Sequence, residues 1–128
     1  MIALILLIIA GIFNACMDVL SFRWDTCIFS NFNELYFNPT YSWTNKWKFD
    51  DKGNKIGEKF FGSSTFLVFL TDFWHLCKFL MLVFISAAIV FYDPIVNWWA
   101  DILIMYCAFT ITFELFYSRI LILKKNDK

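Results

Sequence analysis

The sequence predicts an all-α membrane protein with three transmembrane helices and a structured, aromatic cytoplasmic loop. Two observations predict this class: 60% of the 128 residues are hydrophobic while 17% are charged, and long apolar runs occupy most of the chain. A globule of 15.2 kDa has too little interior to hide so much apolar surface. A lipid bilayer accepts it, so we treat residues 1–128 as a single integral membrane domain.

Three segments are long enough to cross a membrane, which takes about 20 mostly apolar residues. They cover residues 2–20, 66–92 and 95–123, and Asp93 with Pro94 predicts a tight turn between the last two. The first segment lacks the basic start of a signal peptide, so we expect a permanent anchor. Ser63 or Ser64 is expected to cap the second helix, and a helix start beside Lys59 could also hold an anion such as phosphate.

The basic residues outside these segments predict the orientation of the chain. With three spans, the N-terminal end and the 93–100 link lie on one side of the membrane and carry no Lys or Arg. The other side carries nine bases: Arg23, Lys46, Lys48, Lys52, Lys55, Lys59, Lys124, Lys125 and Lys128. Because basic flanks stay in the cytoplasm, we expect a multi-pass protein of the inner (plasma) membrane, with its N-terminus outside and its C-terminus cytoplasmic.

The loop over residues 23–59 is too aromatic for a solvated, disordered linker. Its aromatic residues are Trp24, Phe29, Phe32, Tyr36, Phe37, Tyr41, Trp43, Trp47 and Phe49. Aromatic and polar residues alternate from Tyr41 to Phe49, with Asn45 as the one break in the aromatic face, which is typical of a half-buried strand. Turn residues at 50–54 and a return from Lys55 predict a β-hairpin.

Polar residues lie within or at the edge of the predicted spans, where ionisable groups are costly, and we single out five of them. They are Asn14, Asp18, Asp72, His75 and Glu114. At about 100° per residue they fall on three stripes: 11, 14, 18 and 21; 65, 72 and 75; and 107, 110, 114, 117 and 118. Polar stripes normally face neighbouring helices, so we expect a three-helix bundle that points them into one pocket facing the cytoplasm.

Carboxylates, an imidazole and an amide are ligands for a divalent metal ion, which makes all five residues candidate metal ligands. Asp18, Asp72, His75 and Glu114 are the candidate catalytic residues if such a metal activates water. Simpler readings are hydrogen bonds between helices for Asn14 and Asp18, a position at the membrane interface for Asp72 and His75, and an ion pair of Glu114 with Lys78 or Arg119. No catalytic motif selects a reaction.

These observations favour a structural or assembly subunit that contacts the lipid bilayer and forms a homo-oligomer or joins other membrane subunits. The alternatives are a metal-dependent, membrane-embedded hydrolase or transferase, a proton or ion pathway, and a holin-like pore former. The formal net charge is zero, so nucleic-acid binding is not expected. The four cysteines form no CxxC pair, which argues against a zinc knuckle or a disulfide framework.

Overall fold

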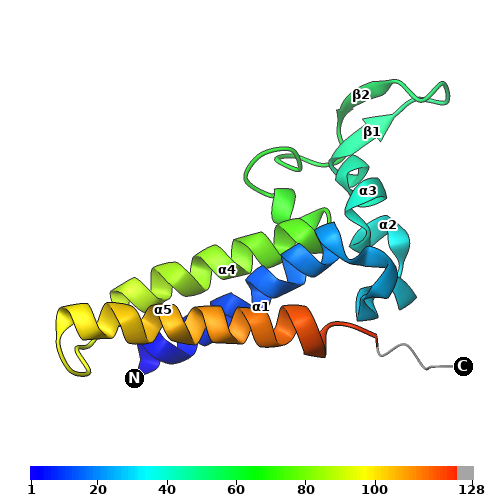
Figure 1. The fold of residues 1–128 in the computed structure, drawn as a ribbon. Helices are drawn as coiled ribbons and strands as arrows, with labels where there is room; N and C mark the ends of the chain where they lie inside the picture. Colours follow the sequence, from blue (N-terminus) through cyan, green and yellow to red (C-terminus); the bar gives the residue numbers. More distant parts are fainter. Residues whose placement is uncertain (124–128) are drawn as a thin grey trace, which may run out of the picture.

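The computed structural model describes residues 1–123 and is mostly helical, with three long helices and one small sheet (Figure 1). The long helices are α1 (Ile2–Phe22), α4 (Phe73–Val90) and α5 (Trp98–Leu115), and α5 continues into the π-helical turn η5 (Phe116–Ile120). Each is long and apolar enough to cross a membrane, which confirms the number of helices predicted from the sequence. Lys124, Lys125 and Lys128, used above for the orientation, lie outside the described residues.

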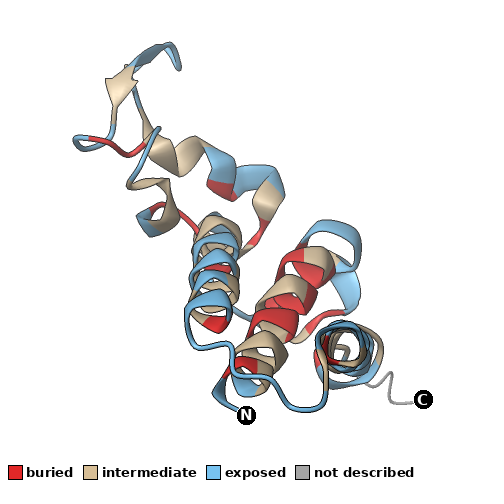
Figure 2. Ribbon diagram, turned by 90° about the vertical axis from the view of Figure 1, so that its left-hand side faces the viewer, coloured by how far each residue is buried: buried red, intermediate tan, exposed pale blue. Residues whose placement is uncertain are grey.

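Helix α1 lies between the other two long helices and packs against both, whereas α4 and α5 pack little on each other (Figure 2). It also carries most of the buried residues of the three. Gly11 marks the contact with α5, because a Cβ atom there would lie 2.8 Å from the carbonyl oxygen of Phe109. The helices therefore form a layer with α1 in the middle, and the closed three-helix bundle expected from the sequence is not what the chain forms.

The second predicted helix starts too early in the sequence-based assignment. Residues 66–72 form the short 3-10 helix η4 (Val68–Leu70) and turns, and α4 begins only at Phe73. Its N-cap is Asp72, in an extended conformation, rather than Ser63 or Ser64. Thr65 consequently lies outside the helix that carries His75, so the stripe predicted through both residues is wrong.

The third predicted helix also begins later than the sequence suggested. It was assigned to residues 95–123, yet α5 starts at Trp98 and its helical continuation ends at Ile120. Asn97 is its N-cap, since the side-chain oxygen accepts a hydrogen bond from the backbone N–H of Ala100 at 3.0 Å. Residues 91–97 form the link between α4 and α5.

The loop contains the predicted hairpin, in a shorter form. Strand β1 (Trp47–Phe49) pairs antiparallel with β2 (Lys55–Glu58), and Gly53 takes a positive φ of 80° in the turn between them. The alternation from Tyr41 does not continue the strand backwards, because α3 (Pro39–Ser42) and η3 (Trp43–Lys46) are helical. Asn38 caps α3 and Pro39 occupies its first turn, so local capping outweighs the period-two pattern.

The first half of the loop is held against the helices by aromatic packing. It consists of η1 (Trp24–Thr26), η2 (Ile28–Asn31) and α2 (Glu34–Phe37). The ring of Phe73, at the start of α4, lies 5.1 Å from that of Phe29 and 4.7 Å from that of Phe37, measured between ring centroids. Ile28 N–H donates to the Leu121 carbonyl at 3.0 Å. These contacts show that the aromatic side chains of the loop pack on the helices, as its composition predicted.

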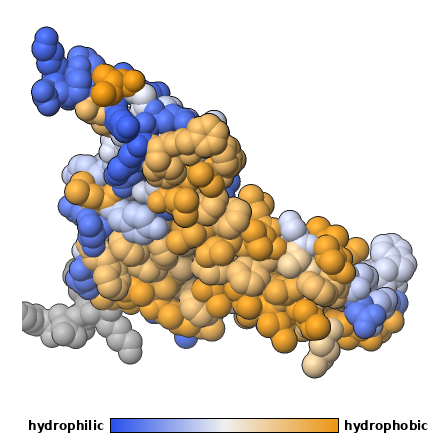
Figure 3. All heavy atoms as spheres, turned by 180° about the vertical axis from the view of Figure 1, so that it is seen from behind, coloured by the Kyte–Doolittle hydropathy of each residue, from blue (hydrophilic) through white to orange (hydrophobic). Residues whose placement is uncertain are grey.

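The surface separates into an apolar body and a hydrophilic arm. Figure 3 shows apolar residues covering most of the long helices, while hydrophilic residues gather at the projecting hairpin. Such a division is compatible with a multi-pass membrane protein.

Candidate functional site

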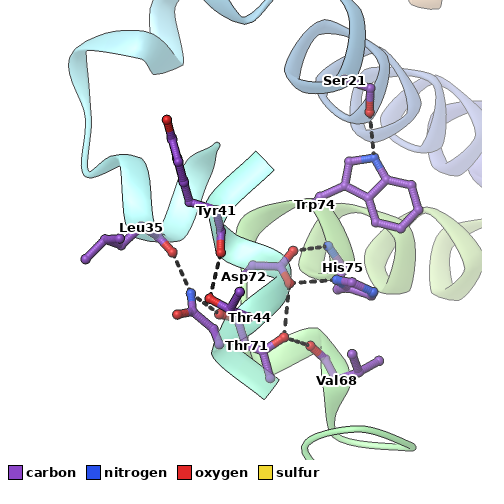
Figure 4. Close-up of polar contacts among 10 residues, drawn as sticks. Ser21, Leu35, Tyr41, Thr44, Val68, Thr71, Asp72, Trp74 and His75 are labelled. Carbon is purple, nitrogen blue, oxygen red and sulfur yellow. Dashed lines mark hydrogen bonds and ion pairs between the residues drawn. The ribbon is translucent and has the colours of Figure 1, made fainter. Parts of the chain in front are cut away.

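The structure brings together two of the predicted site residues, Asp72 and His75, at the start of α4 (Figure 4). One carboxylate oxygen of Asp72, Oδ1, accepts the backbone N–H of His75 at 3.0 Å. The other, Oδ2, lies 2.7 Å from His75 Nδ1 and 3.0 Å from the Thr71 hydroxyl, which is also within 2.7 Å of the Val68 carbonyl. The Asp72 side chain is 2% exposed and that of His75 23%, so the carboxylate is buried and fixes an imidazole that still reaches the surface.

This geometry leaves Nε2 of His75 for contact with another molecule. When Nδ1–H donates to Asp72, neutral His75 offers Nε2 as an acceptor, and protonated His75 offers it as a donor. The carboxylate thus sets the direction of the ring and the role of its outer nitrogen.

Side chains from two other elements hold this corner in place. Asn45, the residue that interrupts the aromatic alternation, donates its amide N–H to the carbonyls of Leu35 and Thr71. The indole N–H of Trp74 donates to the Ser21 hydroxyl at 3.0 Å and so ties α4 to the end of α1. The residue that breaks the aromatic pattern therefore has a structural role, because its hydrogen bonds join the loop to the segment that precedes α4.

Two hollows adjoin His75. The larger has a volume of about 360 Å³ and lies between η3, the 64–69 segment and the first turns of α4. The smaller, of about 70 Å³, lies between α3 and Asp72. His75 lines both, whereas Asp72 lines only the smaller.

The other predicted site residues do not join this pair. Among residues 1–123, the side chains of Asn14 and Asp18 on α1 are half-buried and form no hydrogen bond or ion pair. Glu114 is exposed on α5 and lines a separate cavity of about 460 Å³ with Thr110, Ser118 and Arg119. No ion pair joins Glu114 to Lys78 or Arg119 within the described chain.

A metal centre gains no support from this arrangement. Within residues 1–123, no group of three or more His, Cys, Asp or Glu side chains is placed to hold a metal ion. Asp72 and His75 are two ligands at most, and the Asp72 oxygens already accept hydrogen bonds from Thr71 and His75.

Two carboxylates that the sequence reasoning did not single out organise turns. Asp101 is buried and accepts hydrogen bonds from the Tyr92 hydroxyl at 2.8 Å and from the backbone N–H groups of Ile95 and Val96 at 2.9 and 3.0 Å. Its place in the first turn of α5, where acidic residues are favoured, is the signal that could have found it.

Glu58 performs the same role next to the larger hollow. Its carboxylate accepts the Ser64 hydroxyl and the backbone N–H groups of Gly62 and Ser64. The Ser64 hydroxyl and then the Gly62 amide lower the pKa of Glu58 below its usual range. The anion site predicted at a helix start near Ser63 and Ser64 is therefore wrong, since no long helix begins there and Glu58 itself occupies these donors.

Comparison of the chain with protein-family models, with curated proteins and with solved structures finds no match. The three long apolar helices of the chain are compatible with a multi-pass membrane protein.

Proposed function

We propose that this chain is a small multi-pass membrane protein that acts as a structural or assembly subunit, through self-association or within a larger membrane complex. The proposal places the N-terminus outside and the loop and C-terminus in the cytoplasm, in accordance with the distribution of basic residues.

The observation that carries the proposal is the unequal burial of the three helices. In an 18-residue apolar stretch of each helix, 39% of the residues are buried in α1, compared with 11% in α4 and 6% in the segment Trp98–Ile120. The two outer helices thus have few fully buried residues, and large apolar side chains such as Ile89 and Ile102 remain exposed for lipid or for other helices. Three helices in a single layer bury little area, which favours assembly.

Helix α5 also carries polar groups on its open surface. Cys107, Thr110 and Glu114 are exposed and recur at the spacing of one helix face. The Thr110 hydroxyl is satisfied by the Tyr106 carbonyl at 2.8 Å, but no residue within 1–123 donates a hydrogen bond to the Glu114 carboxylate.

An unpaired charge facing lipid supports a protein neighbour on this face. A charged residue at the centre of a transmembrane helix costs about 3 kcal/mol on the insertion scale. Glu114 lies about 9 Å along the axis from Ile120, so its cost is smaller but is still relieved by a donor from a neighbouring helix. We call the surface formed by Cys107, Thr110 and Glu114 the polar face of α5.

Cysteine crosslinking in native membranes tests the proposal. Of the four cysteines, Cys16, Cys27 and Cys77 are buried, and Cys107 alone is exposed, on the polar face of α5. If copies associate through this face, a mild oxidant should produce a disulfide-linked dimer. Association with another subunit through the same face should instead allow a photoreactive group at Thr110 to capture a specific larger product.

Matched variants interpret the crosslinking result. Cys107→Ser should abolish the disulfide-linked dimer, whereas Cys27→Ser should retain it because that thiol is buried. Absence of any product from position 107 or 110, while a control position on α4 such as Ile89 is crosslinked efficiently, would contradict assembly through α5.

A further inference from the structure

The larger hollow beside His75 combines basic groups with an apolar wall. Lys46 from the end of η3 and His75 and Lys78 from the first turns of α4 contribute the basic groups. Phe69, Phe79 and Leu82 contribute apolar side chains. Residues distant in the sequence therefore place three nitrogen-bearing side chains around one cavity of about 360 Å³.

The backbone around Lys46 is fixed by the segment that faces it. The Lys46 carbonyl accepts the Ser63 hydroxyl at 2.7 Å and the Lys59 N–H at 3.1 Å. Ser63 is fully buried, and the same hydroxyl accepts the N–H of Lys59 at 3.1 Å. Gly62, which precedes Ser63, allows the chain to turn because its positive φ of 77° suits glycine. The loop thus holds Lys46 at the rim of the cavity by its own hydrogen bonds.

The two ammonium groups have no acidic partner in the described chain. Within residues 1–123 the one ion pair is that between His75 and Asp72, so neither Lys46 nor Lys78 has a carboxylate within 4.0 Å. The Lys78 ammonium lies 5.3 Å from the centroid of the Trp74 ring. Unpaired cations gathered at one hollow attract an anion that supplies several acceptor oxygens.

Two acidic side chains, Asp72 and Glu58, contact residues that line the cavity, His75 and Ser64, and accept hydrogen bonds from them. Both oxygens of Asp72 accept hydrogen bonds from Thr71 and His75, and the Glu58 carboxylate accepts those of Gly62 and Ser64. The Ser64 hydroxyl at the cavity is directed to Glu58 and is not counted as a donor to a ligand. Both carboxylates keep their negative charge, but neither lines this cavity, and the ionisable side chains that do line it are Lys46, His75 and Lys78.

The apolar wall indicates what carries the anion. The ring of Phe79 stacks on that of Phe69 with centroids 4.2 Å apart. Phe79 and Leu82 remain 41% and 51% exposed, and they continue from the cavity along the open surface of α4. A soluble phosphate compound makes no contact with such an apolar surface, whereas the acyl chain of a lipid needs one next to the site that binds its headgroup.

We propose that this cavity binds a phosphate group, carried by an anionic lipid whose acyl chain lies along α4. Lys46 and Lys78 hold the phosphate oxygens, and His75, oriented by Asp72, adds its Nε2 when protonated. The proposal rests on the membrane placement proposed above, and it is independent of whether the chain assembles through α5.

Lipid titration followed by native mass spectrometry tests this site on the detergent-purified, full-length protein. The probes are phosphatidylglycerol, phosphatidylcholine with the same acyl chains, and inorganic phosphate. Phosphatidylglycerol should bind more tightly than the other two. Lys46→Gln combined with Lys78→Gln should weaken that binding by about tenfold or more, because it removes two charge-assisted contacts.

The matched control is Lys48→Gln combined with Lys52→Gln, which removes the same charge from exposed lysines of the hairpin outside the cavity. It should change the affinity by about twofold or less, as should the charge-conserving Lys78→Arg. Because bound lipids are counted on whichever oligomer is present, the result does not depend on assembly.

Three outcomes would overturn the proposal. Equal loss of affinity in the two double variants would show general attraction to basic residues. Equal binding of phosphatidylglycerol and phosphatidylcholine would show that lipid binding does not depend on the charge of the headgroup. Lysine-dependent binding of inorganic phosphate as tight as that of phosphatidylglycerol would assign the site to a soluble anion instead of a lipid.

Discussion

Replacing Asp72 by alanine should loosen the first turn of α4 and with it the corner that holds His75. The substitution removes the N-cap acceptor of the His75 N–H, which typically costs about 1 kcal/mol. It also removes the buried partner of the His75 ring at 2.7 Å, worth about another 1 kcal/mol. A total of about 2 kcal/mol corresponds to local opening that is about 30-fold more frequent.

Hydrogen exchange of the detergent-purified protein measures this opening directly. The His75 and Leu76 amides should exchange about 30-fold faster in Asp72→Ala, while amides in the middle of α1 should not change. Asp72→Asn keeps an acceptor of the N-cap type and should give an acceleration of about fivefold. The control is Asp51→Ala, which changes an exposed turn residue of the hairpin.

Two results would refute this reasoning. If Asp72→Ala exchanges no faster than Asp51→Ala, the carboxylate does not cap α4. If the asparagine and alanine variants behave alike, the contact with the ring determines the effect and the cap contributes nothing.

Three further predictions follow from other parts of the chain. Gly11→Val should force α1 and α5 apart at the Phe109 carbonyl and lower the free energy of unfolding by about 1–3 kcal/mol. Thermal unfolding in detergent measures this change, and Ile5→Ala, at an exposed position of α1, is the control. Because the pKa of Glu58 is lowered in the folded chain, the stability that its carboxylate gives to the turn is present above the ordinary pKa of 4.5 and is lost as the pH falls through the lower folded pKa. In that lower pH range the exchange rate of the Gly62 amide, corrected for intrinsic pH dependence, should rise, and Glu58→Gln should remove this transition. A reporter fused after Lys128 should be cytoplasmic and one placed before Ile2 external; the opposite result would overturn the orientation.

The class of fold could be predicted because it depends on features that extend over many residues. Three apolar runs of sufficient length predict three long helices whatever their neighbours are, and an aromatic loop must pack on something. The hairpin also followed from local chemistry, since the 50–54 turn lies between segments that can pair.

The start of α4 could not be read from hydropathy. Residues 66–70 are as apolar as the helix that follows, so composition extends the helix through them, while the actual start is set by one side chain, Asp72, in an extended conformation. The same carboxylate was predicted as a site residue because it looked buried within a helix. Its burial is real, but the N-cap explains much of it.

The convergence of the polar stripes depended on an arrangement that one sequence does not specify. Periodicity places Glu114 on one face of α5, but it does not say whether that face meets α1. The contact is made by the side that includes Phe109 and Thr112, close to Gly11, and Glu114 is left exposed. Asp72 and His75 were expected on the same side because a spacing of i, i+3 places both on one helix face, although their contact forms at the N-cap and not inside the helix.

The mass of the protein in lipid nanodiscs tests the central claim most directly. A single chain has a mass of 15.2 kDa. Native mass spectrometry of protein extracted from its own membrane into nanodiscs should give a complex of two or more copies of this mass, or a complex that contains a further membrane subunit. The variant Glu114→Leu should reduce the abundance of that complex. A single chain at every ratio of lipid to protein, with no copurifying subunit, would contradict the account of this protein as an assembly subunit.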